Sequence, residues 1–263
     1  MKLCERMQWS VVICTLIAAA AASAACGGPT TDSTSQGRAS GTQAKPTDTA
    51  DGPGIMAGTI TFDGTAPTPR PLRMDSDPKC VAEPGATSEL LVVGAGNGLQ
   101  NVFVYVKDGL GTRTYAVPTT PVTLDQKGCR YLPHVFGVQV GQPFMISNSD
   151  STLHNVNAAP KDNRPFNFGQ PVSVPAVSRT FDKPEVMVPL RCDVHGWMNA
   201  YVGVVAHPFF AVTNGNGGFE IKGLPPGTYT IEAWHEQLGT QTRSITVDGQ
   251  APANVSFAFK PTV

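Results

Sequence analysis

A thiol, an imidazole and a thioether follow one another at three-residue intervals in Cys192, His195 and Met198, directly after an apolar run. These sulfur and nitrogen donors are soft or borderline ligands, which suit copper better than magnesium or calcium. Two histidines, one cysteine and a weak axial methionine form the trigonal site that is used for electron transfer, so one more histidine would complete the set. An upstream segment supplies His154. The sequence therefore predicts a copper site built from four residues.

Two other interpretations of these residues stay open. Cys192 could be a buried apolar thiol and Met198 core filler, with both histidines satisfied at the surface. Zinc also binds a thiolate together with imidazoles. The thioether argues against zinc as the intended metal, but it does not prevent zinc from occupying the site.

The two motifs together resemble those of the cupredoxins, or type 1 (blue) copper proteins, in the amicyanin and plastocyanin group. The upstream motif has the cupredoxin form Asn148-x-Asp150-x-x-x-His154-Asn155, and the segment Tyr131-Leu132-Pro133 precedes it. The resemblance implies a Greek-key β-sandwich that binds one copper ion and transfers single electrons. It implies four ligands, which are the equatorial nitrogens of His154 and His195, the thiolate of Cys192 and the axial sulfur of Met198.

The same resemblance assigns roles around the ligands. Asn155 resembles the cupredoxin asparagine that ties the two ligand loops together, with an ordinary turn asparagine as the alternative. Trp197 is expected to shield the thiolate. In cupredoxins the histidine of the C-terminal loop is typically the exposed electron port. His195, Gly196 and Trp197 are therefore the expected docking face for a redox partner protein, such as a cytochrome.

Composition favours an all-β chain without an enzymatic centre. The 263 residues include 27 Gly and 23 Pro but only 15% charged residues, which favours many short strands and turns. The net charge is −1 and no basic stripe stands out, so we expect no nucleic-acid partner. Multicopper enzymes need additional histidine-rich centres, whereas this chain has five histidines. His134 is expected to be half-exposed, and His207 and His235 to be solvated beside strand ends.

The N-terminus has the pattern of a targeting segment. A short basic region, an apolar run and the small residues Ser23-Ala24-Ala25 predict a signal peptide over residues 1–25. Cys26 follows in a context similar to a bacterial lipobox, although Ser stands where Leu is usual. We expect Cys26 to be lipidated, with simple secretion as the alternative. The expected location is the periplasm or cell envelope, as a lipoprotein anchored to the outer membrane.

The segment 26–56 is rich in Thr, Ser, Gly, Ala and Pro, so it is expected to be a disordered tether. Beyond it, three cysteines remain. If Cys192 binds metal, Cys80 and Cys129 are left as one pair in an oxidising compartment, where a disulfide would persist. The same count equally permits Cys80 and Cys129 to stay reduced.

Three folded segments are expected, namely an N-terminal β segment (57–114), the cupredoxin domain (115–206) and a smaller β-sandwich (207–263). The motif from Gly218 to Tyr229 resembles that of carboxypeptidase regulatory-like (transthyretin-like) domains. The last segment is short for such a sandwich, and strands of segment 57–114 look like the missing ones. The cupredoxin part is therefore either inserted within a split sandwich or arranged in tandem with it.

The chain leaves two further functions open beside electron transfer. One is copper binding or delivery without a redox role. The other is an envelope adhesion or carbohydrate-binding module, because the smaller sandwich resembles carbohydrate-binding folds. Tyr229 and Trp234 could stack on a sugar there, although core packing is the more common fate of such aromatic residues.

Overall fold

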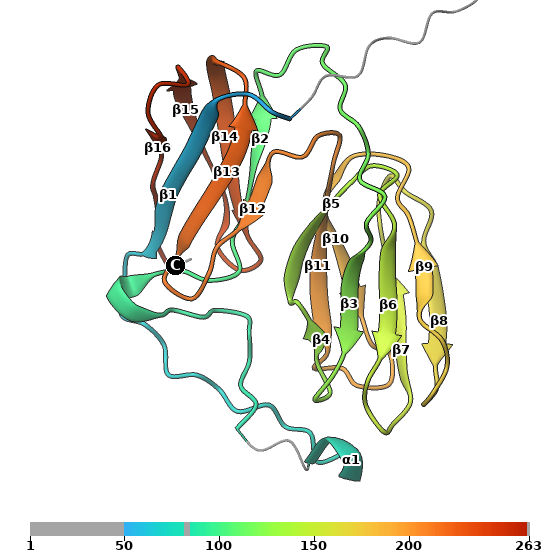
Figure 1. Cartoon of the computed structure of the whole chain (residues 1–263). Coiled ribbons are helices and arrows are strands. Elements are labelled where there is room, and N and C mark those ends of the chain that lie inside the picture. Colours follow the sequence, from blue (N-terminus) through green and yellow to red (C-terminus); the bar gives the residue numbers. More distant parts are fainter. Residues whose placement is uncertain (1–49, 82–84, 262–263) are drawn as a thin grey trace, which may run out of the picture. The chain divides into compact units, whose positions relative to one another are not determined.

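The computed structural model describes residues 50–81 and 85–261 (Figure 1). Nearly all of its regular structure is strand, in agreement with the expected all-β class. The expected signal peptide (1–25), the lipidation site Cys26 and most of the expected tether lie outside the described residues. Within the described ranges, no helix has the length and apolar character needed to span a membrane.

One sandwich, here called the central sandwich, contains strands β3 to β11. Its larger sheet has the order β5-β11-β10-β7-β8, and its smaller sheet has the order β4-β3-β6-β9. The two sheets face each other in Figure 1. The strands are β3 (Val122–Gln126), β4 (Tyr131–Leu132), β5 (Val135–Gln139), β6 (Phe144–Asn148), β7 (His154–Ala158), β8 (Phe166–Gln170), β9 (Val177–Arg179), β10 (Glu185–Arg191) and β11 (Asn199–Val205).

Alternation of apolar side chains builds the core of the central sandwich. In β6, Phe144 and Ile146 are fully buried, and in β11 Ala200, Val202 and Val204 face the same core. Successive side chains of a strand point to opposite faces, so each sheet offers one apolar face to the other. The ligand segments at the ends of β7 and β10 are therefore attached to rigid strands.

The second sandwich is here called the split sandwich. It contains two strands that precede the central sandwich in the sequence and others that follow it. β1 pairs with β13, β16 and β17, and β2 joins the sheet of order β12-β2-β14-β15. Figure 1 shows the blue strand β1 beside the orange and red strands. The strands are β1 (Gly54–Phe62), β2 (Phe103–Asp108), β12 (Phe210–Val212), β13 (Gly218–Leu224), β14 (Gly227–His235), β15 (Gly239–Val247), β16 (Ala253–Asn254) and β17 (Phe257–Phe259).

Strand β1 begins at Gly54, three residues before the expected start of folded sequence at Ala57. Met56, which the expected tether included, is fully buried in the core of the split sandwich. The strand extends this far because Gly54, Ile55 and Met56 pair with β13 and the Met56 side chain is buried, although the surrounding composition is typical of a tether. After β1 a long excursion carries the short helices α1 (Pro78–Val81) and η1 (Ala95–Asn97) before β2 begins.

Candidate metal centre

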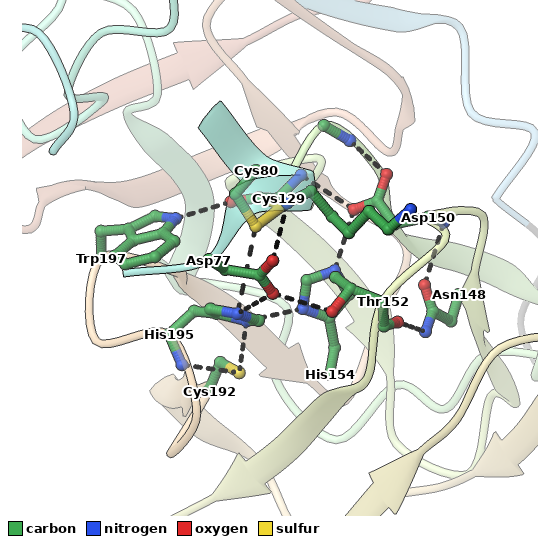
Figure 2. The surroundings of a disulfide bond; sticks show 12 residues. Asp77, Cys80, Cys129, Asn148, Asp150, Thr152, His154, Cys192, His195 and Trp197 are labelled. Carbon is green, nitrogen blue, oxygen red and sulfur yellow. Dashed lines mark hydrogen bonds and ion pairs between the residues drawn. A yellow bond between two sulfur atoms is a disulfide. The ribbon is translucent and has the colours of Figure 1, made fainter. Parts of the chain in front are cut away.

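The fold brings three of the four expected ligands to one point (Figure 2). His154 is the first residue of β7, and Cys192 directly follows β10, its antiparallel neighbour. His195 lies in the loop between β10 and β11. The Nδ1 atoms of His154 and His195 are 2.9 Å apart, and the Cys192 Sγ lies 3.8 Å from the His195 Nδ1. All three side chains are buried.

The spacing of these donor atoms fits a single metal ion. Metal–nitrogen and metal–sulfur bonds of about 2.0 and 2.3 Å in a trigonal plane place the donors roughly 3.5 Å apart. The two distances in the structure lie on either side of this value. Two imidazole nitrogens and one thiol form a donor set that suits copper or zinc and does not suit magnesium or calcium.

A carboxylate contacts the other ring nitrogen of each histidine. The His154 Nε2 lies 2.9 Å from an Asp150 carboxylate oxygen, and the His195 Nε2 lies 3.0 Å from an Asp77 carboxylate oxygen. A carboxylate only accepts hydrogen bonds, so each Nε2 carries a proton that it donates to its carboxylate. The Nδ1 atoms are the ring nitrogens that face each other, 2.9 Å apart.

Burial lowers the pKa of His154, and this effect outweighs the contact with Asp150, which acts in the opposite direction. The imidazole is therefore neutral at physiological pH, which is the form that binds a metal ion. The Asp150 carboxylate is itself held in place, because the backbone N–H groups of Gly128 and Cys129 both donate to it at 2.8 Å.

The loop from Cys192 to Met198 is closed by backbone hydrogen bonds. The Cys192 N–H donates to the Met198 carbonyl at 3.1 Å, and the Met198 N–H donates to the His195 carbonyl at 2.9 Å. The His195 N–H points at the Cys192 Sγ, at 3.3 Å. The Met198 side chain is buried in the same core as Cys192. The axial role of its thioether stays a prediction.

Asn155 connects the two ligand segments. Its side-chain oxygen accepts the N–H of Asp193, and its side-chain nitrogen donates to Asn167 at 2.7 Å and to the Asp193 carboxylate at 3.2 Å. The Tyr131 hydroxyl donates to the Asn155 carbonyl from within the core. The residue directly after the first expected ligand is thus tied to the residue directly after Cys192.

The expectation that His195 forms an exposed electron port is wrong for this structure. The His195 side chain is only 2% exposed. Asp77 contacts its Nε2, and the Cys80 Sγ lies 4.0 Å from the same atom. Trp197, also expected on the docking face, is half-buried and donates its indole N–H to the Cys129 carbonyl at 3.0 Å.

A disulfide joins Cys80 to Cys129, with the two Cα atoms 5.6 Å apart. Among the described residues, Cys192 is the only cysteine outside a disulfide. Sequence reasoning paired Cys80 with Cys129 by counting, but it gave no reason to place them beside a histidine ligand. Asp77 was missed altogether, because it lies in a Pro-rich excursion far from the ligand motifs and follows no periodic pattern.

Other expected features have different surroundings from those predicted. His134 and His235 are buried, and His207 is partly buried with its Nε2 2.8 Å from the Val106 carbonyl oxygen. Tyr229 is a core residue of the split sandwich, and its hydroxyl donates to the Pro225 carbonyl at 2.6 Å. Tyr229 therefore cannot form a sugar-stacking platform.

Comparison with known proteins gave matches to parts of the chain. Residues 198–260 match the model of the carboxypeptidase regulatory-like domain. A Cu(I) amicyanin variant is 21% identical over 34% of this chain and 85% of its own, with a TM-score of 0.29. A purple cupredoxin from Nitrosopumilus maritimus is 18% identical over 32% of this chain and 98% of its own, with a TM-score of 0.27.

A Cu-containing nitrite reductase from Thermus scotoductus SA-01 is 20% identical over 37% of this chain, with a TM-score of 0.31, and the match spans only 25% of the reductase. None of the curated proteins matches the chain. The sheet order describes an all-β chain of two sandwiches, and residues 198–260 match the carboxypeptidase regulatory-like domain.

Proposed function

We propose that this protein binds one copper ion through His154, Cys192, His195 and Met198 and that it carries single electrons in the cell envelope. One observation supports this most strongly, namely that two imidazole Nδ1 atoms and one thiol converge in a buried cluster at the ends of two paired strands. The proposed export and the proposed lipid anchor rest on residues 1–26 of the sequence alone.

Copper would supply the chemistry by exchanging one electron between its two common oxidation states. The residues around it would keep the ligands in one geometry in both states. Hydrogen bonds to Asp77 and Asp150 orient the rings, and those of Asn155 join the ligand segments. Such outer contacts hold the ligands in place, so that the ligands need not move when an electron is transferred.

The partner would have to approach beside His195 rather than on it, because His195 is covered. Two exposed apolar side chains lie next to ligands in the sequence, Leu153 before His154 at 45% exposure and Val194 before His195 at 51%. Exposed apolar side chains beside ligands suit a brief contact with a redox protein. We therefore propose Leu153 and Val194 as part of the docking surface.

Titration of the metal-free protein with copper, followed by visible absorption and electron paramagnetic resonance, tests this function. A 1:1 complex with an intense visible band from the copper–thiolate bond is expected. Cys192→Ala should abolish that band because it removes the only thiolate of the set, whereas His207→Ala, which changes a histidine outside the centre, should keep it. A copper-loaded protein without the band would contradict the proposal.

A further inference from the structure

An excursion between β1 and β2 folds over the candidate centre, and its residues 70–81 are here called the cap. The base of the cap is fixed by a hydrogen bond of 2.9 Å from the Leu72 N–H to the Ala86 carbonyl. Met74 and Cys80 are buried in the core of the central sandwich. The cap is therefore packed onto the sandwich that carries the expected ligands, although in sequence it precedes that sandwich.

Asp77 is the cap residue that reaches the centre. One of its carboxylate oxygens lies 3.0 Å from the His195 Nε2 and accepts the Thr152 hydroxyl at 2.8 Å. Its other carboxylate oxygen accepts the Lys79 N–H at 2.8 Å. Figure 2 shows the Asp77 carboxylate beside the rings of His154 and His195. Three donors thus fix this carboxylate in one orientation.

The disulfide fixes the cap covalently. Cys80 follows Asp77 by three residues and its N–H donates to the Asp77 carbonyl at 3.0 Å. On the other side of the disulfide, the Cys129 N–H donates to Asp150, which contacts the His154 Nε2. One covalent bond therefore joins the two backbone segments that hold the two carboxylates, and each carboxylate orients one imidazole.

We propose that the cap, fastened by the Cys80–Cys129 disulfide, closes the copper centre and that Asp77 is a positioning residue for His195. This inference rests on the copper site proposed above. Asp77 acts through His195, because it accepts the Nε2–H and so directs the Nδ1 lone pair at the ion. The cap also excludes water and competing ligands from the edge of His195, so that bound copper is released slowly.

Loss of the outer hydrogen bond of a metal-ligating histidine lowers metal affinity by roughly ten- to a hundredfold. We therefore expect copper-loaded Asp77→Ala to lose copper to a high-affinity Cu(I) chelator at least ten times faster than the unchanged protein. Cys80→Ser/Cys129→Ser should show a similar acceleration because the cap is no longer fastened. Asp75→Asn, which changes an exposed carboxyl of the same cap, is the matched control and should match the unchanged protein.

Nuclear magnetic resonance of the histidine ring nitrogens in the metal-free protein gives a second readout that does not depend on copper. The His195 Nε2–H should be observed and protected from solvent exchange in the unchanged protein and in Asp75→Asn. It should exchange rapidly in Asp77→Ala and in the double serine variant. Circular dichroism identifies any variant that has failed to fold, and Asp77→Ala keeps the disulfide if the serine variant is unfolded.

The two readouts separate failure of this inference from failure of the proposed function. If the unchanged protein binds no copper, the copper function is overturned. If the His195 ring nevertheless loses its protection from exchange in Asp77→Ala, the closed cap is still supported. The cap proposal is overturned if Asp77→Ala and the double serine variant, both folded, behave like Asp75→Asn in ring exchange and in copper release.

Discussion

At the scale of single residues, the chemistry of the centre depends on which ring nitrogen carries a proton. Asp77 and Asp150 each accept an Nε2–H, and the Nδ1 atoms of His154 and His195 face each other. Two buried imidazoles beside a buried thiol offer donor types that suit a soft metal ion.

Met198 is the residue whose role can be tested most directly by substitution. We expect Met198→Gln to retain copper and to lower the reduction potential by about 59 mV or more, which corresponds to a tenfold change in the ratio of the two oxidation states. The physical reason is that an amide oxygen is a harder donor than a thioether and favours the oxidised ion. Protein-film voltammetry measures the potential.

Met145→Gln, which changes a half-buried methionine of β6, is the control for this substitution and should leave the potential unchanged. An unchanged potential in Met198→Gln as well would mean that the thioether is not bound to the ion. Met198 would then be a core residue only, which is the alternative that the sequence left open.

Sequence reasoning named three residues that the fold brings together, His154, Cys192 and His195, but it did not assign the carboxylates that contact the two rings. Cys192, His195 and Met198 lie within one short loop, so their spacing is visible in the sequence. Asp77 reaches His195 only through the folded path of the excursion, and no local pattern distinguishes it from the other carboxylates of the sequence. The burial of His195 is a consequence of the same long-range contact and was missed for the same reason.

At the scale of elements, the two sandwiches differ in how their strands are connected. The central sandwich is built from consecutive strands, β3 to β11, whereas the split sandwich depends on β1 and β2 from an earlier part of the chain. Alternating apolar residues made β1 recognisable as a strand, and β-branched and aromatic residues made β2 recognisable. Their partner strands were suggested only by the shortness of the last segment, because pairing between strands far apart in the sequence leaves no local sequence pattern.

A cavity in β1 should weaken the split sandwich. Ile60 is fully buried in its core, and Ile60→Ala is expected to reduce the free energy of unfolding by about 2–5 kcal/mol, because a methyl-lined cavity remains. Urea unfolding followed by circular dichroism measures the change. Thr59→Ala, at the exposed neighbouring position of the same strand, should change it by about 0.5 kcal/mol or less.

The copper-dependent visible band is the internal control for Ile60→Ala, since that residue belongs to a different core from the ligands. Loss of the band together with the loss of stability would show that the two sandwiches do not fold independently. An unchanged free energy of unfolding would contradict the contribution assigned to β1.

At the scale of the whole molecule, buried histidines couple stability to pH. Burial, together with the nearby His134, lowers the pKa of His235 to about 4, and the His235 Nδ1 accepts the Gln237 N–H. Burial also lowers the pKa of His207. Burial alone would lower the pKa of His134, but its contact with Glu236 raises the pKa above the usual value.

The free energy of unfolding should therefore fall as the pH decreases from about 6.5 to 4. In this range the unfolded chain binds a proton at His235 that the folded protein does not bind. This difference lowers the free energy of unfolding by up to about 3 kcal/mol. Urea unfolding of the metal-free protein at a series of pH values measures this slope. His235→Gln should flatten it, and an equal slope in that variant would contradict the assignment.

The pairing of β1 with β17 has a consequence for synthesis of the chain. β1 leaves the ribosome before any of its partner strands has been made, with Ile60 and Phe62 still lacking their apolar neighbours. All strands of the central sandwich are complete before translation reaches β17. Closure of the split sandwich must therefore await the last strand, whereas every strand of the central sandwich already has its partners.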